Sequence, residues 1–141
     1  MNFSLMFTIA NAIAVLSWVV LIVSPNQKKV IPYLRILISG FFLGGLYILS
    51  LSLGLGKVEG NFSSLESVRS LFSNDAFLLA GWVHYLSFDL FLGTWEAEDG
   101  KANGIHRLYL VPIHFLTFYY GPAGFVLYLI FRGVKTKRFG F

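Results

Sequence analysis

The sequence lacks cysteine altogether and is poor in charge. With no cysteine among its 141 residues, it can form no disulfide, no cysteine-ligated zinc site and no thiol nucleophile. Charged residues make up 13% of the chain, whereas a soluble domain carries roughly a quarter. No basic, aromatic-interleaved soluble surface is left to hold a nucleic acid. The bilayer is therefore the expected solvent, and membrane lipids are the expected partners.

Apolar residues are abundant in the sequence. They make up 56% of the chain, aromatic residues make up 18%, and the mean hydropathy is +0.70. Four apolar segments each approach the ~20 residues that cross a ~30 Å hydrocarbon core as a helix. We predict an all-α, multi-pass membrane protein, formed by a single domain over 1–141, with spans at about 3–23, 31–55, 76–95 and 108–131.

The connecting segments complete this prediction. Residues 61–71 alternate apolar and polar side chains at helical spacing, which predicts a short amphipathic helix at the membrane interface between the second and third spans. The tail 132–141 is basic and suits a surface of anionic headgroups. Four spans place both termini on one side. Lysine and arginine are almost balanced between the two sides, so the dense basic tail favours cytoplasmic termini.

The third segment carries ionisable residues at membrane depth, namely His84, Asp89 and, near its end, Glu96. Such residues are costly in a bilayer and usually mark a functional site. One stripe recurs every seven residues on this segment, and a matching stripe runs along the fourth segment: Asp75, Trp82, Asp89 and Glu96, and Arg107, His114, Gly121 and Tyr128.

A turn signal at Asp99-Gly100 predicts that these two segments form an antiparallel hairpin. Counting from that turn, Glu96 is level with Arg107, and Asp89 is level with His114 deeper in the membrane. We expect the first pair to be a structural ion pair and the second to be a catalytic acid/base pair, because a histidine lets a buried carboxyl group share a proton. The alternative is that both pairs only join two helices.

His84 is a further catalytic candidate, with helix packing or a pocket wall as its alternative role. It lies ~140° around the helix from Asp89, so the two cannot easily ligate one metal. No cofactor is expected. If a metal bound, its ligands would be Asp89, His114 and Glu96, a set that suits non-haem iron or zinc. A haem held by His84 and His114 is disfavoured, because the two differ in depth by ~8 Å.

Several motifs resemble the abscisic-acid-deficient-four-like membrane proteins, whose plant members are linked to making neoxanthin from violaxanthin. The resemblance covers most of the chain and is densest between residues 72 and 91. It rests on Phe72-Ser73-Asn74-Asp75, Trp82-Val83-His84, Asp89-Leu90-Phe91, His106-Arg107 and Gly121-Pro122-Ala123-Gly124. The pattern from Trp82 to Phe91 is fairly specific, since it places two ionisable groups inside one span.

The resemblance implies a four-helix membrane protein that handles a carotenoid or another hydrophobic isoprenoid. Neoxanthin formation is an isomerisation in which an epoxide opens and an allene forms, with one proton removed and one donated. Asp89 and His114 would match that requirement. Aromatic residues would line a slot for the polyene, namely Trp82, Phe88, Phe91, Phe118 and Tyr119. Two alternatives stay open: a non-catalytic carotenoid- or lipid-binding or accessory protein, and a metal- or haem-dependent membrane oxidoreductase.

Overall fold

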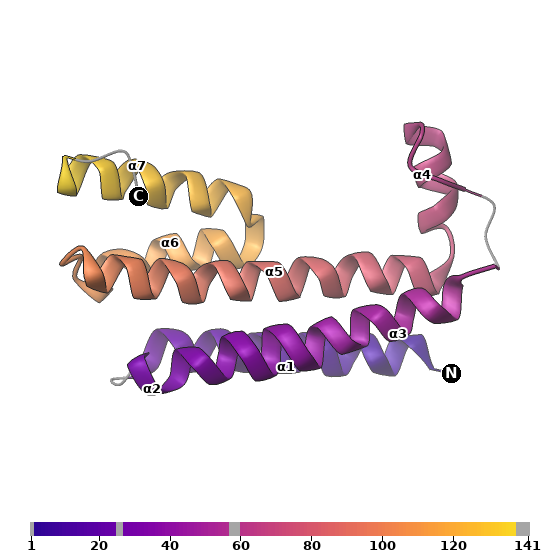
Figure 1. Cartoon of the computed structure of the whole chain (residues 1–141), viewed down its shortest axis with the longest axis horizontal. Coiled ribbons are helices and arrows are strands. Elements are labelled where there is room, and N and C mark those ends of the chain that lie inside the picture. The colour runs from indigo at the N-terminus through magenta and orange to yellow at the C-terminus, as the bar shows by residue number, and fades with distance from the viewer. Residues whose placement is uncertain (1, 25–26, 57–59, 138–141) are drawn as a thin grey trace.

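A computed structural model describes residues 2–24, 27–56 and 60–137 of the chain (Figure 1). Helices and short connections account for these residues, and no strand occurs among them, which confirms the all-α prediction. The elements are α1 (Phe3–Val23), α2 (Gln27–Pro32), the π-helix η1 (Tyr33–Leu43), α3 (Gly44–Gly54), α4 (Leu65–Phe72), α5 (Asp75–Ala102), α6 (Arg107–Tyr120) and α7 (Pro122–Thr136).

Three helices are long and apolar enough to cross a membrane: Phe3–Val23, Gln27–Gly54 and Asp75–Ala102. The second is one continuous helix made of α2, η1 and α3. Asparagine caps two of the three, since Asn2 accepts a hydrogen bond from the Leu5 amide at 3.0 Å and Asn74 accepts one from the Ala76 amide at 2.9 Å. The helical starts follow from these local side chains rather than from distant contacts.

The central helix α5 packs against all the other helices of the described chain. Small residues of α1, including Ala10 and Ala14, let its backbone approach α5, and they are fully buried. Trp18 of α1 fills the space beside Gly93 of α5, where an added Cβ would lie 2.3 Å from the indole. By contrast, the outer faces leave large apolar side chains exposed, such as Phe41. This distribution suits helices surrounded by lipid.

The expected fourth span is wrong as a single helix. The chain reverses at Gly121, so that α6 and α7 form an antiparallel hairpin against the C-terminal half of α5 (Figure 1). Gly121 adopts φ 33°, a conformation that L side chains rarely adopt, and Pro122 follows it at the start of α7. Gly121 and Pro122 therefore produce a full reversal of the chain.

This reversal changes which helix ends lie at each end of the bundle. The start of α1 and the helix α4 lie at one end of the bundle, whereas α2, the start of α6 and the end of α7 lie at the other (Figure 1). The start of α1 and the end of α7 thus lie at opposite ends of the bundle, whereas the side of the membrane on which each terminus lies stays a prediction. Arg138 of the basic tail lies outside the described residues.

The helix expected near residues 61–71 is α4, which begins later, at Leu65. Ser64 caps it by accepting a hydrogen bond from the Ser67 amide at 3.1 Å. Figure 1 shows α4 standing away from the long helices, beside the start of α5. Its position at a membrane interface stays a prediction.

Candidate functional site

A carboxylate, an imidazole and a hydroxyl meet where α5 faces α6. Glu96 is fully buried, and the Thr117 hydroxyl donates to its carboxylate at 3.0 Å from each oxygen. His114 Nε2 lies 3.9 Å from Glu96 Oε2 and has no hydrogen-bond partner among the described residues. His114 itself is 1% exposed. The chain therefore holds a carboxyl group and an imidazole close together in a position shielded from bulk water.

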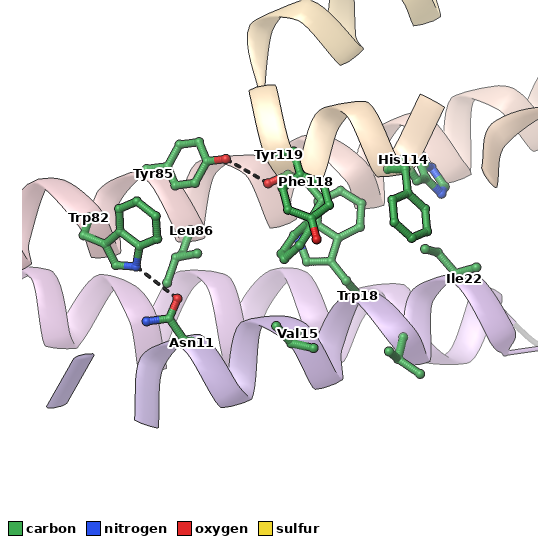
Figure 2. Close-up of a pocket in the computed structure, with 12 residues that line it drawn as sticks. Asn11, Val15, Trp18, Ile22, Trp82, Tyr85, Leu86, His114, Phe118 and Tyr119 are labelled. Atoms are coloured by element: carbon green, nitrogen blue, oxygen red, sulfur yellow. Dashed lines mark hydrogen bonds between the residues drawn. The ribbon is translucent and has the colours of Figure 1, made fainter. Parts of the chain in front are cut away.

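The imidazole also lines a cleft of about 470 Å³ between α1, α5 and α6 (Figure 2). Apolar and aromatic side chains dominate the lining, which consists of Asn11, Val15, Trp18, Val19, Ile22, Trp82, Tyr85, Leu86, His114, Phe115, Phe118 and Tyr119. A cleft of this size with few polar groups is typical of a site for a hydrophobic ligand. His114 links the cleft on one side to Glu96 on the other.

Two hydrogen bonds hold the walls of this cleft together (Figure 2). Trp82 Nε1 donates to Asn11 Oδ1 at 3.1 Å and so joins α5 to α1. The Tyr85 hydroxyl donates to the Phe118 carbonyl at 2.8 Å and so joins α5 to α6. The ring of Trp18 meets His114 edge-on, with centroids 5.9 Å apart. The aromatic walls are thus fixed relative to the imidazole.

The two expected residue pairs are wrong in register, by one heptad. Glu96 faces His114 instead of Arg107, and Asp89 faces Gly121 instead of His114. The cause is the length of α5, which continues to Ala102, so the connection to α6 lies beyond the expected Asp99-Gly100 turn. Arg107 instead donates to the carbonyl of Ile22 at the end of α1.

Asp89 and His84 take separate positions. Asp89 is 7% exposed, its Oδ2 has no hydrogen-bond partner among the described residues, and its carboxylate lies against the hairpin turn. A Cβ on Gly121 would be 2.5 Å from Asp89 Oδ1. His84 is exposed, stacked on Phe88 with ring centroids 4.6 Å apart and close to Tyr47 of α3. The structure does not bring His84 to the other two predicted catalytic residues.

The expected ligand-lining aromatics divide between two faces of α5. Trp82, Phe118 and Tyr119 line the cleft beside His114. Phe88 and Phe91 instead line a groove of about 650 Å³ between α5 and η1, together with Arg35. The sequence pattern identified aromatic residues on α5 but could not assign them to one cavity.

Several residues of the site were missed from sequence. Thr117 lies three residues after His114, a spacing that places both on one helix face, and this signal could have identified it. Trp18 and Asn11 come from α1, which has no sequence signal linking it to α5. A further polar cluster joins α5 to α7, because Tyr128 and Arg132 both donate to the Asp99 carboxylate, the latter from Nε at 2.6 Å.

The three side chains considered from sequence as metal ligands do not lie close together. Within residues 2–24, 27–56 and 60–137, no group of three histidine or acidic side chains is placed to hold one ion. Glu96 and His114 lie together, whereas Asp89 lies at the hairpin turn. The described residues thus present one close carboxyl–imidazole pair and no three-ligand set.

Comparison with known protein families shows to which family the chain belongs. The family model for ABA DEFICIENT 4-like proteins matches residues 5–128. The chain belongs to the ABA4-like family. This match extends from α1 into α7 and includes every residue of the cleft beside His114. No curated protein and no solved structure matches the chain of this ABA4-like protein.

The observed register makes a first prediction. In a double-mutant cycle, Glu96→Gln and Thr117→Val should couple by about 0.5–3 kcal/mol, as contacting groups do, because the hydroxyl donates directly to the carboxylate. Glu96→Gln and Arg107→Gln should be additive. The free energy of unfolding in detergent micelles is the measurement. Coupling of Glu96 to Arg107 but not to Thr117 would restore the register expected from sequence.

Proposed function

We propose that this ABA4-like protein binds a hydrophobic isoprenoid of the carotenoid class in the cleft between α1, α5 and α6, and isomerises it by proton transfer. One observation carries the proposal: a buried imidazole, His114, has a ligand-sized aromatic cleft on one side and a buried carboxylate, Glu96, on the other. The membership in the family and the apolar helices support a membrane protein of this kind.

The proposed reaction is an internal rearrangement of an epoxy-carotenoid. A base removes a proton from a polyene carbon, the electron pair of that C–H bond forms the new double bond of an allene, and the neighbouring C–O bond of the epoxide breaks. The oxygen then accepts a proton and becomes a hydroxyl group. Atoms and electrons balance without an oxidant or a reductant.

His114 is the residue that we assign to contact the reacting atoms. It accepts the proton from carbon and returns a proton to the epoxide oxygen. Glu96 stabilises the imidazolium formed between these steps, because the carboxylate lies 3.9 Å from Nε2. Thr117 positions that carboxylate through its hydroxyl. Asp89, which was expected to act with His114, instead lies on α5 against the hairpin turn at Gly121.

The second prediction tests this assignment with two matched variants. His114→Phe keeps an aromatic wall but removes the base, and we expect conversion of an epoxy-carotenoid in proteoliposomes to fall by about 10²–10⁴-fold, the usual contribution of general acid/base catalysis. His84→Phe makes the same change on the exposed opposite face and should leave the rate unaltered. Chromatography of the extracted pigment measures conversion, and pigment absorbance measures binding.

Each other outcome changes the conclusion. An unaltered rate in His114→Phe would refute the proton-transfer role of that residue. Pigment binding by the wild-type protein without any conversion would identify a binding protein instead. Activity that a strong chelator abolishes and that added iron or zinc restores would support the metal-dependent alternative.

A further inference from the structure

Basic residues gather at one end of the bundle, here called the basic end. It comprises α2 with the start of η1, the junction of α5 and α6, and the end of α7, which lie together in Figure 1. Its lysines and arginines are Lys28, Lys29, Arg35, Lys101, Arg107, Arg132, Lys135 and Lys137. Among the residues that the structure describes, only Arg69 of α4 places such a side chain at the opposite end.

Acidic residues offset only part of this charge. Glu98 pairs with Arg35 at 2.9 Å, and Asp99 pairs with Arg132 at 2.6 Å. Glu96 is buried between α5 and α6 and does not reach the surface. Lys28, Lys29, Lys101, Lys135 and Lys137 are exposed, and no ion pair is found for them within the described chain. The basic end therefore presents a surplus of exposed positive charge to its surroundings.

The hairpin is what assembles this surface. A straight helix through residues 108–131 would carry the end of α7 to the side of α4, and lysine and arginine would be nearly balanced between the two sides. Because the chain turns back at Gly121, the charges of α7 join those of α2 and of the α5–α6 connection. The unequal distribution of lysine and arginine between the two ends of the bundle thus comes from the tertiary structure. Counting these residues along four straight spans does not reveal it.

We infer that the basic end is a surface that binds the anionic phospholipid headgroups of the cytoplasmic leaflet, with α4 and the start of α1 on the opposite side of the membrane. Charge complementarity selects this partner, because lysine and arginine are retained on the cytoplasmic side and are attracted to an anionic bilayer surface. The long apolar helices lead directly into this end, which places the charges at headgroup level.

The same orientation fixes the depth of the candidate site. His114 lies seven residues beyond Arg107 on α6, which corresponds to ~10 Å along a helix. The Glu96–His114 pair is then in the cytoplasmic half of the bilayer, and the cleft extends from it towards Asn11 and Trp82. The orientation itself does not depend on what the cleft binds.

Single cysteines test the orientation, since the chain has none of its own. Lys29→Cys, Lys135→Cys and Glu66→Cys would be produced in a bacterial inner membrane and treated with a membrane-impermeant maleimide. We expect cysteines at 29 and 135 to react only in inverted vesicles and the cysteine at 66 only in spheroplasts. Opposite sides for 29 and 135 would overturn the shared basic end. Reaction of both from outside would overturn the cytoplasmic assignment.

A lipid comparison tests the partner. The protein would be placed in nanodiscs of phosphatidylcholine alone or with phosphatidylglycerol, and its unfolding midpoint measured. We expect the midpoint to rise with phosphatidylglycerol, and the rise to disappear when Lys28, Lys29, Lys101 and Lys135 are all replaced by glutamine. Arg69→Gln, at the other end, should retain the rise. Equal midpoints in both lipids for the wild-type protein would refute headgroup binding.

Discussion

Replacing Gly124 with alanine is expected to disrupt the α6–α7 hairpin, with a loss of about 3 kcal/mol or more in the free energy of unfolding. A Cβ at this position would lie 2.2 Å from the Thr117 amide nitrogen and 2.5 Å from its Cα. Overpacking against side chains usually costs about 1–3 kcal/mol. Here backbone atoms cannot rotate away, so the two helices must separate.

The control is Gly45→Ala in α3, where an added Cβ meets nothing within 4 Å. In a helix this change is expected to be neutral or stabilising by about 0.5–1 kcal/mol. Thermal unfolding in one detergent compares the two variants. Because α6 forms a wall of the cleft, Gly124→Ala should also lose pigment binding. Equal midpoints for the two variants would show that α7 does not pack on α6 as described.

The second large effect is expected for Asp99→Asn. The Asp99 carboxylate accepts hydrogen bonds from Tyr128, which is fully buried, and from Arg132, which is 8% exposed. Removing one partner of a fully buried ion pair typically costs about 3–5 kcal/mol. This pair is mostly buried, with side chains 17% (Asp99) and 10% (Arg132) exposed, so a loss in the free energy of unfolding at the lower end of that range is expected.

The adjacent Glu98→Gln is the matched control. Its carboxylate side chain is 58% exposed and pairs with Arg35. Ion pairs at such exposure contribute about 0–1 kcal/mol, so only a small change is expected. The loss in free energy of unfolding for Tyr128→Phe should lie between those of the other two variants, at about 1–3 kcal/mol. This substitution removes one hydrogen-bond donor but leaves the ion pair in place. A larger effect for Glu98 than for Asp99 would contradict the buried position of the α5–α7 cluster.

These two sites connect stability to the proposed chemistry. Neither Gly124 nor Asp99 lines the cleft, yet both hold α7 in place, and α7 in turn supports α6. His114 and Thr117 lie on α6, so the spacing between imidazole and carboxylate depends on that support. A variant that loosens the hairpin is therefore expected to reduce activity before the three long helices unfold.

The sequence by itself determined the local features of this protein. Uninterrupted apolar runs indicated the long helices, and α1 has the bounds expected for the first span, Phe3–Val23. Asn74 defines the start of α5 with its own side chain, because a cap acts on the adjacent turn. The seven-residue spacing indicated which faces of α5 and α6 carry the polar stripes. Each of these signals is contained within a few helical turns.

Only the tertiary structure decided how those features meet. A repeat of seven residues looks the same after a shift of seven, so the stripes could not distinguish Arg107 from His114 as the partner of Glu96. The end of α5 at Ala102 sets that register. The reversal of the chain at Gly121-Pro122 depends on α7 packing closely on α6 at Gly124. Side-chain packing between distant segments thus selected the site, the hairpin and the end of the bundle at which the basic residues gather.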